Sequence, residues 1–217
     1  MLGRRFLAVL ALALLTARCA DHPTAVQVPI SGAPHFLRWA GSASPQFRVN
    51  GAFASRASQT APLSLDQYEV SFWAVRGQPR SAQLNYLDAA GGTSHPFLLL
   101  TITDPETLPN GSELAEGDSV LVTVRIDTTK IGVSLEPTGL QFGTPGQMQM
   151  WYGGAGGDLN GDGVVDSTDT YVETQLLGMW YREGDVSDWQ RIPAMQAVDE
   201  KSFTVALPHF SQYAVSW

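Results

Sequence analysis

The stretch Ser119-Val120-Leu121-Val122-Thr123-Val124-Arg125-Ile126 determines the expected fold class. Every second residue is a β-branched apolar residue, and Thr123 and Arg125 are among the residues between them. Successive side chains of a strand point to opposite faces, so an apolar period of two predicts a strand with one buried face.

The same period recurs on both sides of this stretch. Apolar residues alternate over 68–74, 82–86, 131–135, 148–152, 203–207 and 213–217, and an apolar run covers 97–102. Turn residues such as Gly91-Gly92 and Pro137-Thr138-Gly139 separate these runs. The pattern predicts an all-β fold, an antiparallel β-sandwich over residues 66–217.

Residues 170–182 fit two patterns. Val172 and Leu176 follow a helical stripe, whereas Leu177, Met179 and Tyr181 alternate as a strand. We expect at most one helical turn after residue 169, followed by a strand from about residue 176 to 182.

The first 18 residues have the pattern of a secretory signal peptide. Arg4 and Arg5 precede an apolar run from Phe6 to Leu15. A basic start followed by such a short apolar run is typical of a signal peptide and is too short for a transmembrane helix. We therefore expect an exported protein.

The chain's one cysteine, Cys19, lies directly after this segment. Leu15-Thr16-Ala17-Arg18-Cys19 resembles the lipobox of bacterial lipoproteins, except at Arg18, where that pattern has a small residue. The resemblance implies lipidation of Cys19 and a lipoprotein of the outer membrane or cell surface. Ordinary cleavage near Ala17 or Ala20 would instead give a periplasmic or secreted protein.

Residues 19–65 are expected to form a mostly irregular, low-complexity tether. No acidic residue occurs from His22 to Leu65, and Pro, Ser, Ala and Gly dominate the composition. One strand within residues 46–53 is compatible with the pattern.

The charge of the chain favours a cation as partner. Residues 1–18 hold three of the 13 basic residues and none of the 21 acidic ones, so the remainder carries a net charge of −11. Such a surface disfavours nucleic acid and anionic lipid, and leaves the lipid anchor as the expected membrane contact.

The acidic segment Asp158–Asp169 has the spacing of a twelve-residue calcium loop. The expected ligands at positions 1, 3, 5, 7, 9 and 12 are Asp158, Asn160, Asp162, the carbonyl of Val164, Asp166 and Asp169. Gly163 occupies position 6, where the loop turns sharply. The sequence therefore predicts a site for one Ca²⁺ ion.

The expected affinity is weak to moderate, about 10⁻⁴–10⁻³ M, the range of extracellular calcium modules. Asp at position 12 has a shorter reach than Glu, which makes Mg²⁺ a competitor. The glycine run Gly153-Gly154-Ala155-Gly156-Gly157 disfavours an incoming helix. We therefore expect an EF-hand-like loop inserted between two strands.

The loop is similar to the calcium loop of dockerins, which also ends in Asp, and Leu176-Leu177-Gly178 matches the end of the dockerin helix. The resemblance implies a calcium site and a carbohydrate-associated module. Dockerins carry two such repeats and bind cohesin through both helices, whereas this chain has one repeat.

A second resemblance covers residues 66–217. Leu135-Glu136-Pro137-Thr138-Gly139-Leu140-Gln141-Phe142 and Leu207-Pro208-His209-Phe210-Ser211-Gln212-Tyr213 are similar to motifs of the ZU-type β-sandwich. That domain occurs in ankyrins, netrin receptors and bacterial envelope proteins. The resemblance implies a non-enzymatic structural or interaction module.

Some relatives of that domain cleave themselves within a His-Phe-Ser sequence, which corresponds to His209, Phe210 and Ser211. Cleavage would require the Ser211 hydroxyl to attack the Phe210 carbonyl with a nearby base. The alternative is that Phe210 is a core anchor. We expect a non-catalytic envelope protein that binds one Ca²⁺, with a carbohydrate-associated module and a self-cleaving domain as alternatives.

Overall fold

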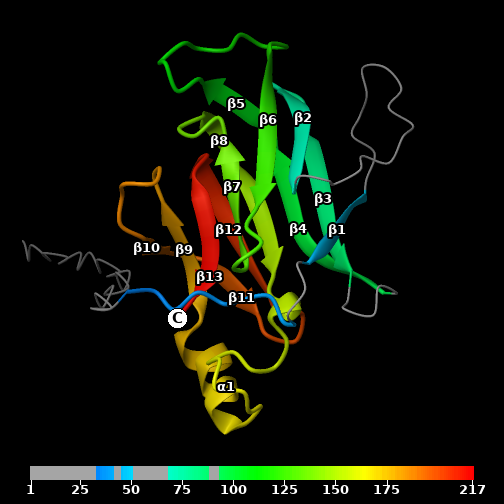
Figure 1. The fold of residues 1–217 in the computed structure, drawn as a ribbon. Coiled ribbons are helices and arrows are strands. Elements are labelled where there is room, and N and C mark those ends of the chain that lie inside the picture. Colours follow the sequence, from blue (N-terminus) through cyan, green and yellow to red (C-terminus); the bar gives the residue numbers. More distant parts are fainter. Residues whose placement is uncertain (1–32, 42–44, 51–67, 88–92) are drawn as a thin grey trace, which may run out of the picture. The chain divides into compact units, whose positions relative to one another are not determined.

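Two antiparallel sheets contain most of the residues that the structure describes (Figure 1). This computed structural model describes residues 33–41, 45–50, 68–87 and 93–217. The expected signal peptide, Cys19 and much of the expected tether lie outside the described residues. Within them, the predicted all-β, antiparallel fold is confirmed.

The first sheet has the order β1-β3-β4-β8-β12-β11, with β5 paired to β8. Its strands are β1 (Gln46–Asn50), β3 (Arg80–Leu87), β4 (Ser94–Ile102), β5 (Asp104–Thr107), β8 (Gln141–Trp151), β11 (Met195–Ala197) and β12 (Ser202–His209). The second sheet has the order β10-β9-β13-β7-β6-β2. Its strands are β2 (Glu69–Val75), β6 (Ser119–Ile126), β7 (Gly132–Glu136), β9 (Gly178–Arg182), β10 (Gln190–Ile192) and β13 (Gln212–Ser216).

The β2–β6 pair shows how the period of two is used. Phe72 lies opposite Val122 in the register, and both side chains are buried. On the other face, Ser71 and Thr123 share a hydrogen bond of 2.8 Å between their hydroxyls. One face of this pair therefore enters the core, while the other faces solvent and carries both polar side chains and the exposed Trp73 and Leu121.

The buried rows of both sheets belong to one hydrophobic cluster. Leu100 and Met148 contribute from the first sheet, and Val122, Leu135 and Val215 contribute from the second. Each fully buried aliphatic side chain of this kind stabilises the fold by about 1.5–3 kcal/mol relative to an exposed one. This shared core fixes the strand ends from which the acidic loop emerges.

Residues 34–40, which we call the strap, extend the packed unit toward the N-terminus. The Leu37 amide donates to the Val215 carbonyl at 3.1 Å, and the Ile131 amide donates to the Leu37 carbonyl at 2.7 Å. The side chains of Leu37 and Trp39 are buried in the core. Residues from Pro34 to Trp217 form one compact unit, and β1 includes the strand expected near Gln46.

The strap was missed because its alternation is brief and lies among Pro, Ser and Gly residues. Leu37 and Trp39 are its two buried apolar side chains, which is too few to define a periodic pattern. Pairing with the end of β13 gives the segment an extended form that its composition does not indicate.

The segment after the acidic loop also differs from expectation. The α-helix α1 (Ser167–Tyr171) continues into the π-helical turn η2 (Val172–Leu176), and β9 starts at Gly178. The strand expected from about residue 176 to 182 is thus present as β9, whereas the helical segment runs to Leu176 and is longer than the single turn expected. Asp166 and Asp169 form a capping box that starts the helix, and the buried Val172 holds it against the core.

Candidate metal centre

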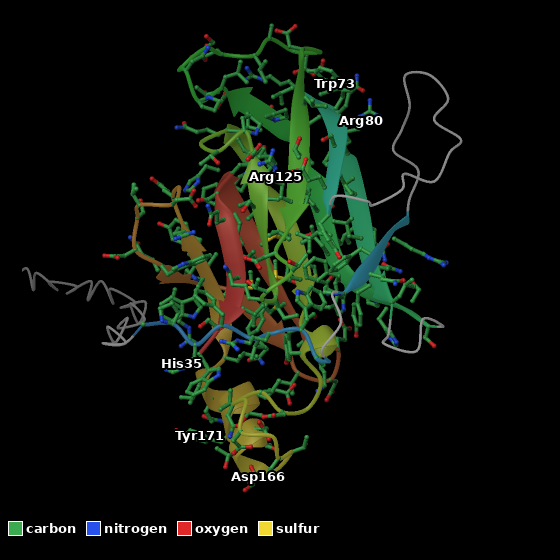
Figure 2. All side chains as sticks on the ribbon, viewed as in Figure 1. His35, Trp73, Arg80, Arg125, Asp166 and Tyr171 are labelled. Atoms are coloured by element: carbon green, nitrogen blue, oxygen red, sulfur yellow. The ribbon has the colours of Figure 1, made fainter. Side chains whose placement is uncertain are left out.

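The acidic loop joins the two sheets. The chain leaves β8 of the first sheet, passes through the 3₁₀ turn η1 (Gly153–Ala155), the loop, α1 and η2, and enters β9 of the second sheet. Figure 2 shows Asp166 and Tyr171 close together at this end of the fold. The loop is thus an insertion between two strands, as its flanking sequence predicts.

Asp158 organises the first half of the loop. Its Oδ1 accepts hydrogen bonds from the amides of Gly161 at 2.8 Å and Asp162 at 3.2 Å, and its Oδ2 accepts from Gly163 at 2.8 Å. Gly161 and Gly163 have φ angles of +79° and +89°, which other residues rarely adopt. The two glycines let the backbone curl around the first carboxylate.

Asn160 and Asp162 form two further local turns. Asn160 Oδ1 accepts from the Asp162 amide at 2.9 Å, and Asp162 Oδ1 accepts from the Val164 amide at 2.8 Å. Asn and Asp commonly bond to the backbone two residues ahead. Oxygens at positions 1, 3 and 5 therefore all face backbone amides.

Asp169 closes the loop. Its Oδ1 accepts from the amides of Leu159 at 2.7 Å and Asn160 at 3.1 Å, and its Oδ2 accepts from the Asp166 amide at 2.9 Å. The hydrogen bond from Asp166, with those from Asn160 and Leu159, lowers the pKa of this carboxyl although burial opposes the shift. Asp169 therefore ties the start of the loop to the start of α1.

This structural role of Asp169 was not part of the sequence prediction, which treated the residue as a ligand. The signal was present, because Asp166-Ser167-Thr168-Asp169 places a capping residue three positions before a second acid. Thr168 donates its amide to Asp166 Oδ1 at 2.7 Å, as such a cap requires.

The donor set of the loop fits a hard cation better than it fits a transition metal. Four carboxylates, one amide oxygen and one backbone carbonyl supply oxygen alone, the donor type that Ca²⁺ prefers. Asp169 Oδ1 already accepts two amides, which leaves Oδ2 as the oxygen with a remaining lone pair.

The acidic side chains of the loop do not point to one common centre in this structure. Across the residues that the structure describes, no three His, Cys, Asp or Glu side chains are grouped so that they could hold a metal ion. The carboxylates turn toward backbone amides instead.

The His-Phe-Ser sequence lies where β12 passes into β13. The Ser211 hydroxyl donates to the Arg182 carbonyl, and Ser211 is completely buried. The His209 Nδ1 lies 3.3 Å from the Phe210 carbonyl oxygen, and the Phe210 ring packs against Phe142. The serine and the histidine thus contact backbone carbonyls rather than each other.

Tryptophan rings can stack on sugars, and five tryptophans of the two sheets and their connections fall into different environments. Trp180 is buried, whereas Trp151, Trp189 and Trp217 are partly buried. Trp73 is 59% exposed on the outer face of β2, opposite Leu121 in the register. Of these side chains, Trp73 is the one with a broadly accessible ring.

No protein-family model, curated protein or solved structure matches this chain. In the part of the chain that the structure describes, no helix is long and apolar enough to cross a membrane.

Proposed function

We propose that this chain is an exported, non-catalytic module of the bacterial cell envelope that binds one Ca²⁺ ion in the loop 158–169. The observation that carries the proposal is the twelve-residue loop itself. Its oxygen side chains have calcium-loop spacing, and Gly161 and Gly163 have positive φ angles. The role of the module is structural or interactive, with an envelope protein or glycan as partner.

A β-sandwich of the ZU type is part of this proposal. It is supported by the single hydrophobic cluster to which both sheets contribute, and by the antiparallel order of the strands. A stable sandwich presents its loops and outer faces for contact. This suits a structural or interaction module.

The electrostatics of the loop support a bound cation. Asp158, Asp162, Asp166 and Asp169 lie within twelve residues that include no basic side chain. No ion pair among the described residues involves any of the four. A divalent ion would relieve their mutual repulsion and hold the connection between β8 and β9 rigid.

The cellular localisation of the protein is inferred from its first residues. Export, lipidation of Cys19 and attachment to the outer membrane or cell surface follow from the signal-like pattern of residues 1–19. Release into the periplasm or medium is the alternative, and a mass shift on Cys19 after globomycin-sensitive processing would distinguish the two.

Calorimetry on chelator-treated protein tests the metal site. At a dissociation constant of about 10⁻⁴–10⁻³ M, 10 mM Ca²⁺ should stabilise the fold by about 1.4–2.7 kcal/mol. The Asp162→Asn variant should lose most of this effect, whereas Asp199→Asn, an exposed acid outside the loop, should keep it. Absence of both heat and stabilisation in the wild-type protein would refute the proposal.

A carbohydrate-associated module is a second candidate, favoured by the exposure of Trp73. An accessible indole face can stack on a sugar ring, and the Ser71–Thr123 hydroxyl pair lies on the same face of β2 and β6. Glycan binding that Trp73→Ala abolishes and Trp189→Ala retains would support this candidate.

A further inference from the structure

The strap and the acidic loop contact the same short segment of chain. The Ala40 amide donates to the Gly154 carbonyl at 2.8 Å, which fixes the end of the strap to η1. Only two residues, Gly156 and Gly157, separate η1 from Asp158, the first residue of the loop. The strap therefore rests on the segment that leads into the proposed metal site.

Gly154 is required for this contact. A β-carbon at this position would lie 2.5 Å from Trp39 Cζ3 and 2.8 Å from Trp39 Cε3. A β-carbon at the neighbouring Gly153 would meet the Tyr86 hydroxyl at an ordinary 3.4 Å. The Trp39 ring thus packs directly on the backbone at Gly154.

A second connection runs through the C-terminal residue. The Trp217 indole donates to the Leu159 carbonyl at 3.4 Å, and the Trp217 ring stacks on His35 with centroids 4.6 Å apart. His35 and Trp217 also exchange backbone hydrogen bonds of 2.9 and 3.2 Å. Trp217 therefore contacts both the strap and the loop.

Leu159 carries this contact into the loop. Its side chain belongs to the hydrophobic cluster, and its amide donates to Asp169 Oδ1 at 2.7 Å. Asp169 is the proposed ligand at position 12. A continuous series of contacts thus joins His35, Trp217, Leu159 and Asp169.

We propose that docking of the strap and binding of Ca²⁺ in the loop are coupled, so that each favours the other. This inference rests on the proposed function of the loop. An ion that holds the Asp169 carboxylate in place also holds the Leu159 amide that donates to it. The Leu159 carbonyl in turn accepts from the Trp217 indole, which contacts the strap. Coupling of binding equilibria is reciprocal, so release of the strap must weaken ion binding by the same factor.

The rate of cleavage by trypsin measures how often the strap is released from the fold. Arg38 is exposed, but its flanking residues Leu37 and Trp39 are buried, so cleavage after Arg38 requires the strap to open. In the full chain, Ca²⁺ should slow this cleavage by about fivefold or more, the lower end of typical coupling between sites. Mass spectrometry identifies the cleaved bond.

Variants of two neighbouring glycines test the reverse effect, that of strap release on Ca²⁺ binding. Gly154→Ala displaces Trp39 without touching a proposed ligand, so it should speed cleavage after Arg38 in the presence of chelator and weaken Ca²⁺ binding about fivefold. Gly153→Ala, the matched control, should change neither. Trp217→Phe keeps an aromatic ring but removes the indole donor to Leu159, and should also weaken Ca²⁺ binding.

The outcomes separate this inference from the proposed function. If the wild-type chain binds no Ca²⁺, the proposed function fails and the coupling fails with it. If the wild-type chain binds Ca²⁺ but cleavage after Arg38 is equally fast with ion and with chelator, the coupling alone is overturned. This comparison holds even if a variant does not fold.

Discussion

Replacement of Trp39 by alanine should destabilise the fold by about 4 kcal/mol, within the 3–5 kcal/mol typical of Trp→Ala in a core. The side chain is 9% exposed, and its ring lies near Phe47 and Phe97 with centroids 5.1 and 5.0 Å away. Its indole nitrogen donates to the Asp127 carbonyl at 2.8 Å, a bond worth about 1 kcal/mol.

This effect is large relative to the stability of a single domain, which is about 5–15 kcal/mol. It corresponds to a fall in melting temperature of about 10 °C for a domain of this size. Trp39→Phe should retain much of the packing and lose the hydrogen bond, so an intermediate effect is expected.

The assay is urea unfolding in the presence of chelator, because the chelator removes any contribution of Ca²⁺ to the unfolding free energy. Trp73→Ala is the matched control, since this indole is 59% exposed and its removal should cost about 1 kcal/mol or less. Equal losses in the Trp39 and Trp73 variants would refute the assignment of residues 34–40 to the folded unit.

Three further predictions concern single side chains. Because the pKa of Asp169 is lowered in the folded state, its carboxylate stabilises the fold at pH values above the unfolded-state pKa, and this stabilisation is lost as pH falls through the folded-state pKa. Asp169→Asn should therefore reduce the loss of unfolding free energy that acid causes, as measured by urea unfolding at a series of pH values. Ser211→Ala should lower the free energy of unfolding by about 1–2 kcal/mol because it removes the buried donor to the Arg182 carbonyl. The wild-type chain should keep its intact mass at neutral pH, and a fragment ending at residue 210 would instead indicate self-cleavage. Arg125→Ala, which removes the half-exposed ion pairs with Glu69 and Glu136, should change the unfolding free energy by about 1 kcal/mol or less in a thermal or urea melt.

The strands of this fold were predictable because burial and alternation coincide along them. Residues such as Val120, Val122 and Val124 each place a β-branched side chain on the buried face of a long strand. The helical segment after the loop was less predictable because its packing depends on Val172 and on a two-residue cap. The strap depends on a partner strand at the opposite end of the sequence, which local pattern does not reveal.

At the candidate metal centre, the sequence predicted which residues share the loop but not how their oxygens are used. Spacing alone indicates possible ligands, and it brings Asp158 and Asp169 into one loop. The competition between backbone amides and a cation for the same carboxylates is a matter of three-dimensional geometry. The amide contacts of Asp169 illustrate this, because they involve residues nine and ten positions away.

The pairing of His35 with Trp217 has a consequence for the order of folding. These partners are 182 residues apart in the sequence (217 − 35), so their contact closes a very long segment of chain. Contacts of such high sequence separation form late and slow the folding of a domain. We expect the two sheets to assemble before the strap docks on them.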